Sequence, residues 1–408
     1  MRILHVLTYY RPHVSGLTIY VERLARSLAA AGQQVTVLTS QYDRALPRRE
    51  LRDGVNVVRV PVLARISKGV LMPEFGITLR RLLPSQDLVH LHLPQFDGAG
   101  VAINARLSNK PSLLTVHGDI RLPNGPFNWM VQRVINLMNC IAGHAVDRVV
   151  SYTEDFARHS RYLSRYQQKL SIIPPPIEIE SPTPEDLEAF RHKWQVAPAQ
   201  RPLIGMCARL ATEKGVEVLV QALQIIRRQR PGARVLFAGP YRDVIGEEAY
   251  ARRLQPAFDA LGPAWTFVGT LHGRELSAFY TICDVTVLPS LNSTESFGLV
   301  QVESMLCGTP VVCSDLPGVR VAIQTTGMGR VVPAGDASAL AAAILDVCDH
   351  RAHYVKPRAF IAQHYSTERT VRDYLQLYDL LIQRRTPPFT PSQAAKQTLP
   401  ARGECDAN

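Results

Sequence analysis

Short apolar runs alternate with segments of helical periodicity along most of the chain. Residues 2–8 form an apolar run, and residues 18–31 then place apolar side chains on one helical face until Gly32. Further apolar runs follow over residues 34–39, 55–61, 88–93 and 112–117. Alternation of this kind predicts an α/β domain with a mostly parallel sheet.

A run of three prolines at 174–176 interrupts the alternation and predicts a stiff extended connector. A short helix is expected over 185–194, and a second α/β series then begins. Its expected strands span residues 203–207, 235–238, 265–268, 285–288 and 311–313. Helices are expected between them, for example over 215–228 and 298–306.

This pattern predicts two doubly wound, Rossmann-like domains with parallel sheets that face each other across a cleft. We place the first domain at 1–177, a linker and the start of the second domain at 178–200, and the second domain at 201–366. An amphipathic helix within 367–385 is expected to pack back onto the first domain. Residues 386–408 are rich in Pro, Ser, Gln and Ala and are expected to form a disordered tail.

Charge is distributed unevenly between the two halves. The 408 residues carry a formal net charge of +11, and residues 1–180 alone hold 22 basic and 13 acidic side chains, a net charge of +9. The composition, 46% hydrophobic and 20% charged, is that of a soluble globular protein. The asymmetry indicates that the first half faces an anionic partner, which can be nucleic acid, a membrane surface or a phosphorylated ligand.

The chain start and the cysteines indicate a cytoplasmic protein. No apolar run approaches the length of a membrane span, and the first residues are typical of a buried strand rather than a secretory signal. The seven cysteines are scattered without a Cys-x-x-Cys pair, so we expect free thiols in a reducing compartment.

Two cations lie in the loop that follows the expected strand at 203–207. Ligands of open α/β sheets bind at the carboxyl ends of the strands, so Arg209 and Lys214 can converge there on a diphosphate. On this loop alone, ordinary surface charges explain the pattern better than a diphosphate site does.

A second loop carries a more specific arrangement. Glu295 precedes a Phe-Gly-Leu turn, and Gly298 stands where a helix is expected to begin, so that backbone amides there attract anions. Glu303 lies inside the first turns of that helix, where a carboxylate can accept two hydrogen bonds from a ribose diol. The two glutamates alone are a weak signal, and the turn between them makes it specific.

With these two loops, the segments 284–290, 308–312, 15–16 and 115–119 resemble the retaining glycosyltransferases of family 4, the sucrose-synthase-like glycosyl transferase group 1. The resemblance covers nearly all of residues 1–385. It implies the GT-B fold and transfer of a sugar from a nucleotide-diphosphate donor to an acceptor hydroxyl.

On the donor side, the resemblance implies that Arg209 and Lys214 hold the diphosphate and stabilise the charge that grows on it. Glu303 would bind the donor ribose, and Glu295 would contact the donor sugar. The other implied donor-binding residues are Leu271, Phe297, Gly298 and Leu299. The donor is expected to be a UDP- or GDP-sugar.

On the other side of the cleft, the resemblance implies that Gly16 lets the first-domain loop approach the phosphates closely. His117 would line the cleft near the transferred sugar. Ser15, His90 and Asp119 are expected on the acceptor side. The family often has a second glycine at the position of Ser15, so this chain departs from the pattern there.

The resemblance also implies transfer on one face of the sugar, with the leaving phosphate helping to deprotonate the acceptor and without an enzymic nucleophile. We expect no cofactor besides the donor, which is a co-substrate. No Asp-x-Asp signature for manganese occurs in the sequence. His90 and His92 share one face of a strand and can bind metal, but no third ligand is apparent, so a metal-independent enzyme is expected.

Two segments of the first domain have sequences that can bind to an anionic membrane surface. Residues 64–83 interleave apolar side chains with Arg65, Lys68, Arg80 and Arg81, and residues 127–142 form an apolar helix with one charge. The apolar side chains of that helix are Phe127, Met130, Val134, Leu137, Met138 and Ile141. Either segment can lie on a lipid surface and serve a lipid-linked or glycan acceptor, or both can pack inside the domain.

Several other functions remain open at this point. A sugar-nucleotide epimerase of GT-B shape would need carboxylates for acid and base chemistry, and a non-catalytic protein would bind the nucleotide sugar without turnover. A nicotinamide dehydrogenase is disfavoured because no Gly-x-Gly-x-x-Gly follows the first strand. Nucleic acid is excluded because the chain shows no nucleic-acid-binding motif and only 7% aromatic residues.

Overall fold

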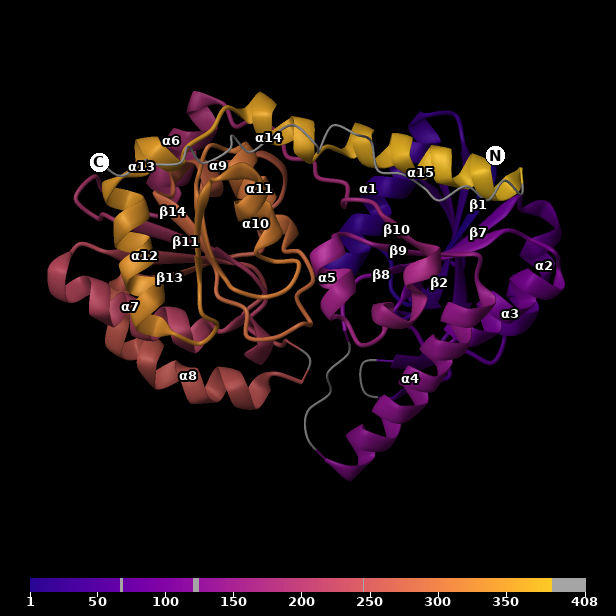
Figure 1. Ribbon diagram of the computed structural model, residues 1–408. Helices are drawn as coiled ribbons and strands as arrows, with labels where there is room; N and C mark the ends of the chain where they lie inside the picture. Colours follow the sequence, from indigo (N-terminus) through magenta and orange to yellow (C-terminus); the bar gives the residue numbers. More distant parts are fainter. Residues whose placement is uncertain (67–68, 120–124, 245, 384–408) are drawn as a thin grey trace, which may run out of the picture.

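A computed structural model describes residues 1–66, 69–119, 125–244 and 246–383. The chain forms two α/β units, one on an eight-stranded sheet and one on a six-stranded sheet, each covered by helices (Figure 1). We refer to them as the first and the second domain. The α/β class with two parallel sheets is therefore confirmed. The predicted tail at 386–408 lies outside the described residues.

The first sheet has the strand order β10-β9-β8-β7-β1-β2-β4-β3, and all its pairs are parallel except β3 with β4. Its strands are β1 (Arg2–Val6), β2 (Gln34–Gln41), β3 (Arg49–Arg52), β4 (Val55–Pro61), β7 (Leu88–Leu93), β8 (Ser112–Val116), β9 (Arg148–Ser151) and β10 (Leu170–Ile172). β7 and β8 are buried along their whole length, as expected for central parallel strands. A separate two-stranded antiparallel sheet is formed by β5 (Ala64–Ile66) and β6 (Gly69–Leu71).

The helices of this half are α1 (Gly16–Ala30), α2 (Phe75–Leu82), α3 (Gly98–Leu107), α4 (Pro126–Ala145) and α5 (Glu154–His159), with 3-10 turns η1 (Leu83–Ser85) and η2 (Leu163–Lys169). Helix α1 begins where the Ser15 hydroxyl accepts a hydrogen bond from the Thr18 amide, at 3.2 Å. Its apolar stripe is buried against the sheet. The chain leaves the helix at Gly32, whose φ is +81°.

The second sheet has the order β13-β12-β11-β14-β15-β16 and is parallel throughout. Its strands are β11 (Leu203–Cys207), β12 (Arg234–Ala238), β13 (Trp265–Gly269), β14 (Val285–Leu288), β15 (Val311–Ser314) and β16 (Gly329–Val332). The helical elements of this half are α6 (Pro184–Lys193), η3 (Thr212–Lys214), α7 (Val216–Gln229), α8 (Glu248–Leu261), η4 (Gly262–Ala264), α9 (Gly273–Ile282), α10 (Leu299–Leu306), α11 (Val321–Thr326), α12 (Ala337–Asp349), α13 (Arg351–Tyr354) and α14 (Arg358–His364). The strand order reverses direction between β11 and β14, and doubly wound sheets bind their ligands at such a point.

The last helix, α15 (Thr367–Ile382), runs from the second domain along the first and packs against α1 (Figure 1). The hydroxyls of Tyr20 on α1 and Tyr374 on α15 are 2.6 Å apart in a fully buried contact. Tyr378, one turn further, bonds to the ring of His90 at 2.7 Å. Helix α15 is therefore tied to the first domain although it follows the second in the sequence.

The two segments considered for membrane contact differ in the structure. In 64–83, Phe75, Leu79 and Leu83 are buried, whereas Leu71 and Ile77 are exposed. The described part of this segment therefore packs only partly inside the first domain, and Lys68 lies outside the described residues. Helix α4 instead turns large apolar side chains to solvent. Among the described residues, no helix is both long enough and apolar enough to span a bilayer.

Candidate active site

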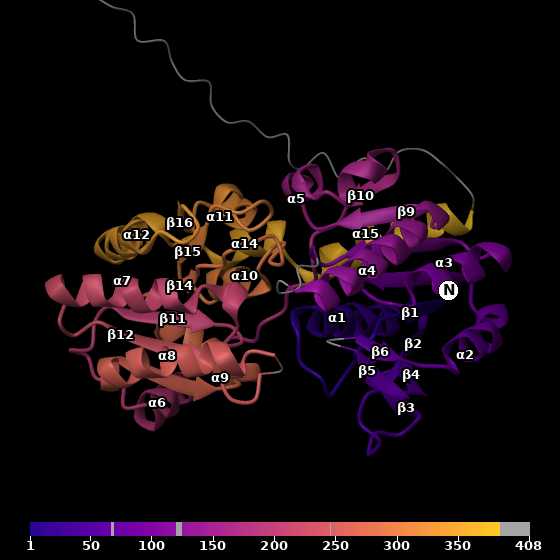
Figure 2. The ribbon, with the colours of Figure 1, turned by 90° about the horizontal axis from the view of Figure 1, so that it is seen from below.

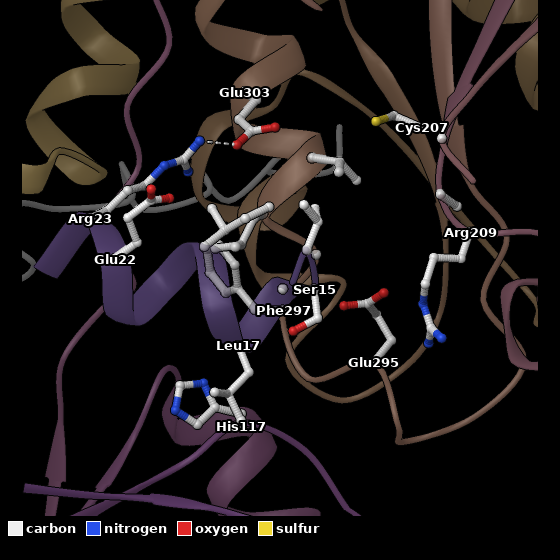
Figure 3. A pocket seen from close by; sticks show the side chains of 18 of the residues that line it. Ser15, Leu17, Glu22, Arg23, His117, Cys207, Arg209, Glu295, Phe297 and Glu303 are labelled. Carbon is white, nitrogen blue, oxygen red and sulfur yellow. Dashed lines mark hydrogen bonds and ion pairs between the residues drawn. The ribbon is translucent and has the colours of Figure 1, made fainter. Parts of the chain in front are cut away.

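A cleft of about 710 Å³ lies between the two domains. It collects side chains and loops from the carboxyl ends of both sheets (Figure 3). The sequence-predicted residues that line it are Ser15, Gly16, His117, Asp119, Arg209, Lys214, Leu271, Glu295, Phe297, Gly298, Leu299 and Glu303. His90 does not line it.

The cation loop is held by a tight turn between β11 and α7. Gly215 has a φ of +65°, and a Cβ there would lie 2.1 Å from the carbonyl oxygen of Pro289, so only glycine fits. The turn leaves Arg209 and Lys214 facing the cleft. The Lys214 ammonium donates to Glu295 Oε2 at 2.6 Å, and Arg209 donates to Glu213 at 2.9 Å.

The Phe-Gly-Leu turn depends on a second left-handed glycine. Gly298 has a φ of +78° and caps the start of α10, and a Cβ there would lie 2.2 Å from a methyl group of Leu288. The first amides of α10 therefore point into the cleft, as expected for a helix N-terminus that receives anions. Phe297 is buried beneath them.

Glu303 is held from both domains. Its Oε1 accepts a hydrogen bond from Arg23 on α1 at 2.7 Å (Figure 3). Its Oε2 accepts one from the hydroxyl of Tyr280 at 3.2 Å. A carboxylate has about four acceptor positions, so room for further hydroxyl donors remains. Sequence reasoning missed Arg23, which lies 280 positions from its partner and carries no motif of its own.

The first-domain loop at 15–16 is open toward the cleft. A Cβ on Gly16 would meet no protein atom within 4 Å, so nothing within the folded chain requires glycine there. Any constraint on that position must come from a bound molecule. Ser15 is used locally, because its hydroxyl caps α1 and lies 2.9 Å from that of Thr18.

The loop at 117–119 touches the second domain directly. The Ser296 hydroxyl donates to the carbonyl of His117 at 2.7 Å, and the amide of Asp119 donates to the carbonyl of Ser293 at 3.3 Å. A Cβ on Gly118 would lie 2.7 Å from the carbonyl oxygen of Thr294, so the backbones meet closely. The two domains are therefore in direct contact beside the cleft.

Both ring nitrogens of His117 are already engaged. Nε2 bonds to His92 Nδ1 at 3.0 Å, and Nδ1 bonds to the Tyr152 hydroxyl. Burial lowers the pKa of His117 to about 3, so the ring is neutral near pH 7. What His117 offers the cleft is therefore the edge of a fixed neutral ring rather than a free base.

The structure corrects the expectation for His90. Its side chain is fully buried in β7, where Nδ1 bonds to Tyr378 and Nε2 to Thr115, each at 2.7 Å. The residue therefore supports the packing of α15 and has no access to an acceptor.

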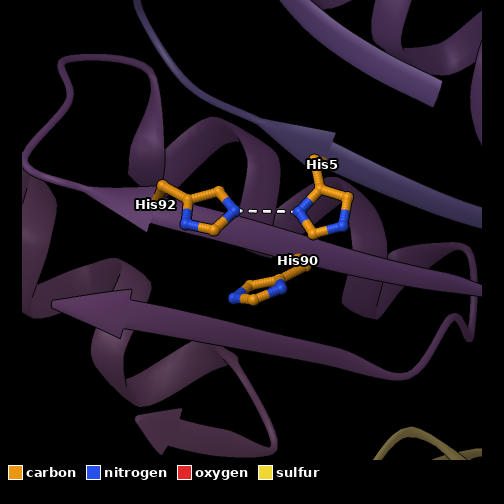
Figure 4. A group of neighbouring side chains, drawn as sticks. All are labelled: His5, His90 and His92. Carbon is orange, nitrogen blue, oxygen red and sulfur yellow. Dashed lines mark hydrogen bonds between the residues drawn. The ribbon is translucent and has the colours of Figure 1, made fainter. Parts of the chain in front are cut away.

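A third histidine lies beside this pair, contrary to expectation. His5 stands opposite His90 in the β1–β7 register, and His5 Nδ1 bonds to His92 Nε2 at 2.9 Å (Figure 4). One ligand atom from each of the three rings falls within 4.8 Å of the others, so within the described part of the chain these residues are the group that can hold a metal ion. However, His5 and His92 are joined by a hydrogen bond, both nitrogens of His90 bond to Tyr378 and Thr115, and five of the six ring nitrogens already have partners.

The class of protein is defined by two Rossmann-like domains, a cleft between them, paired cations before one helix and a carboxylate held from both domains. They are the parts of a GT-B glycosyltransferase that uses a nucleotide-sugar donor. The family model for Glycosyltransferase Family 4 matches residues 14–181, and that for Glycosyl transferases group 1 matches residues 189–364. The chain belongs to this family of retaining glycosyltransferases.

Curated relatives match over nearly the whole chain. The D-inositol 3-phosphate glycosyltransferase of Acidothermus cellulolyticus is 29% identical over an alignment of 412 residues, gaps included. The alignment covers 95% of this chain and 89% of the relative. The 2-deoxystreptamine N-acetyl-D-glucosaminyltransferase of Streptomyces fradiae is 28% identical and covers 91% of this chain and 92% of its own length.

Solved structures show the same fold. Sucrose-phosphate synthase from Thermosynechococcus elongatus superposes with a TM-score of 0.73 at 23% identity, covering 94% of this chain and 99% of its own. Anabaena HepE in complex with UDP-glucose gives 0.74 at 19% identity, covering 93% and 99%. The GT-B expectation is confirmed, and transfer of a sugar replaces the epimerase, dehydrogenase and purely binding alternatives.

Proposed function

We propose that the protein transfers a hexosyl group from a UDP- or GDP-sugar to a hydroxyl of a glycan or lipid-linked acceptor held against the first domain. One observation carries the proposal. A single cleft brings the cations and carboxylates of the second domain together with the 15–16 and 117–119 loops of the first. Donor-binding and acceptor-binding groups thus face each other across one space.

In this proposal Arg209 and Lys214 bind the diphosphate and stabilise the charge that develops as the sugar leaves. Both have N–H groups beyond those that bond to carboxylates, so the diphosphate can bind without breaking either ion pair. Lys214 also fixes Glu295, whose carboxylate accepts from a sugar hydroxyl. Glu303, held by Arg23 and Tyr280, accepts from the ribose hydroxyls.

The bond changes balance without a protein nucleophile. The bond from the anomeric carbon to the diphosphate oxygen breaks, and the bond to the acceptor oxygen forms on the same face. The acceptor proton passes to the leaving phosphate oxygen. His117 is neutral with both nitrogens engaged, so in this proposal it shapes the sugar site and transfers no proton.

The names of the relatives suggest candidate acceptors. Their names give D-inositol 3-phosphate and 2-deoxystreptamine, which are both polyhydroxylated rings, one of them anionic. The net charge of +9 on residues 1–180 favours an anionic acceptor, or one presented by an anionic surface. Transfer assays with these two compounds and with a lipid-linked sugar separate the possibilities.

The decisive experiment combines calorimetry with kinetics. UDP, GDP and ADP are titrated first, and transfer from the matching sugar donors is then measured for the wild type and Lys214→Ala. We expect one nucleotide to bind and Lys214→Ala to lower kcat/KM by at least about a hundredfold while the fold is retained. Lys193→Ala, an exposed lysine paired with Glu275 away from the cleft, is the matched control. Failure of all three nucleotides to bind, or near-full activity of Lys214→Ala, would contradict the proposal.

A further inference from the structure

Helix α4 exposes the apolar face that its sequence defines. Phe127, Trp129, Met130, Val134 and Leu137 are 56%, 62%, 52%, 39% and 57% exposed. The face toward the domain contains smaller or polar residues instead, among them Asn139 and Gly143. A helix that buries its weaker face and exposes its apolar one is typical of a surface that meets another apolar phase.

Close packing explains why helix α4 buries its face of small residues and exposes its apolar face. A Cβ on Gly143 would lie 2.5 Å from both the Tyr162 hydroxyl and the Tyr166 ring, so α4 and η2 approach each other at a glycine. The hydroxyl of Tyr162 donates to the carbonyl of Asn139 at 2.8 Å. The small residues are therefore needed inside, and the large apolar side chains remain outside.

The charges around this face are all of one sign. Helix α4 and the neighbouring segment 161–169 contain four cations and no Asp or Glu. Arg133 lies over the Trp129 ring at 4.9 Å, and Arg161 and Arg165 are exposed on the segment that packs along α4. Within the part of the chain that the structure describes, none of these three arginines has an ion-pair partner. An apolar face bordered by cations is complementary to an anionic lipid surface.

The location of α4 relates this face to the cleft. The helix begins at Pro126, seven positions after Asp119, which lines the cleft. It extends beyond the rest of the first domain in Figure 1, and Figure 2 shows it beside α3. α3 adds two more exposed apolar side chains, Ile103 and Leu107. Of the described large hydrophobic residues that are exposed, only Phe360 lies in the second domain.

We propose that the exposed face of α4 docks the first domain on an anionic lipid bilayer, which presents the acceptor to the cleft. The docking itself rests on the surface of α4 alone, and its link to the acceptor rests on the proposed function. The helix lies in the interface, with Trp129, Met130 and Leu137 among the acyl chains and the arginines at the headgroups.

The test is co-sedimentation with vesicles of phosphatidylcholine alone and of equal parts phosphatidylcholine and phosphatidylglycerol. We expect the wild type to bind the mixed vesicles and to be released by salt. The double variant Trp129→Ser/Leu137→Ser should bind at least about a hundredfold more weakly, since each buried apolar side chain contributes about tenfold or more. Arg161→Gln/Arg165→Gln should weaken binding by about fivefold per cation for mixed vesicles only. Phe360→Ser in the second domain is the matched control and should bind as the wild type does.

Tryptophan fluorescence gives a second readout. The chain has three tryptophans, and Trp129 is the exposed one, so a blue shift on mixed vesicles should disappear in Trp129→Phe although binding persists. Absence of vesicle binding in the wild type, or equal binding by the serine variant, would overturn the proposal. So would a dimer in solution that the serine variant converts to a monomer without any vesicle binding. Nucleotide titration of the same variants keeps this outcome separate from failure of the donor site.

Discussion

Mild acid should destabilise the protein through its buried histidines. We expect this loss of stability at pH values well above those at which ordinary carboxylates titrate. Burial lowers the pKa of His5 and His117 to about 3, and it lowers those of His90 and His92 well below the ordinary value. These rings stay neutral in the folded chain but take up protons near pH 6.5 in the unfolded chain. The unfolded state then binds more protons, so stability falls as the pH falls below about 6.5.

The size of the effect follows from linkage. Between about pH 7.5 and about pH 5.5, each histidine that stays neutral when folded costs about 1.4 kcal/mol, nearly independently of how low its folded pKa lies. The four rings together cost about 5 kcal/mol. Asp97 acts in the opposite direction, because burial raises its pKa to about 6, and it returns roughly 0.8 kcal/mol. The net loss of about 4 to 5 kcal/mol is a large part of an ordinary folding stability.

Urea unfolding followed by circular dichroism at several pH values measures this loss. His5→Gln should reduce it by about 1.4 kcal/mol, because one proton-binding group is removed from the unfolded chain. His192→Gln, which replaces an exposed histidine, should leave it unchanged. A stability that varies by less than about 1 kcal/mol over this range would show that the cluster is charged or solvated in the folded state, and our account of it would be refuted.

Two further substitutions test the donor site. Arg23→Gln should raise the donor KM by several-fold, up to about tenfold, with little change in kcat, because Glu303 loses the bond that orients it; a lower KM would show instead that Arg23 blocks the ribose site. Gly298→Ala should lower stability by about 1–3 kcal/mol in urea unfolding, since its φ is positive and the added methyl meets Leu288; wild-type stability would mean that the turn relaxes freely.

The strands of the fold could be predicted because parallel strands are apolar on both faces. The expected run at 88–93 agrees in its bounds with β7, and that at 203–207 with β11. Shorter strands such as β9 and β16 were not predicted, because their four residues mix polar and apolar side chains and acquire their pairing only from neighbours. Whether such a short segment forms a strand depends on its neighbours in the sheet, and the local sequence pattern does not show these neighbours.

Helix α4 illustrates a different limit. Its sequence defines an apolar face clearly but does not say which way that face points. The direction depends on Gly143, which admits Tyr162 and Tyr166, and a hydrophobicity pattern gives little weight to such a residue. Periodicity therefore predicted the helix and left open whether its apolar side packs inside or meets a lipid surface.

The candidate site was predictable where the chain carries a motif and not where it depends on distant pairs. Arg209, Lys214, Glu295 and Glu303 lie in short stretches next to strand ends, and the structure brings all four to one cleft. Arg23 contacts this cleft from a helix that shows only an amphipathic pattern. His5 likewise joins His90 and His92 only through the parallel register of β1 and β7.

The charge of the first half can now be assigned to a place. The cleft-facing arginines of the first domain are each matched by a carboxylate, Arg11 by Glu22, Arg23 by Glu303 and Arg26 by Glu178. They therefore add little net charge to the donor site, which relies on the cations of the second domain. Among the described residues, Arg133, Arg161 and Arg165 place part of the excess beside the apolar face of α4. These three arginines lie away from the donor site and are not needed to bind a nucleotide sugar. An anionic bilayer would attract them.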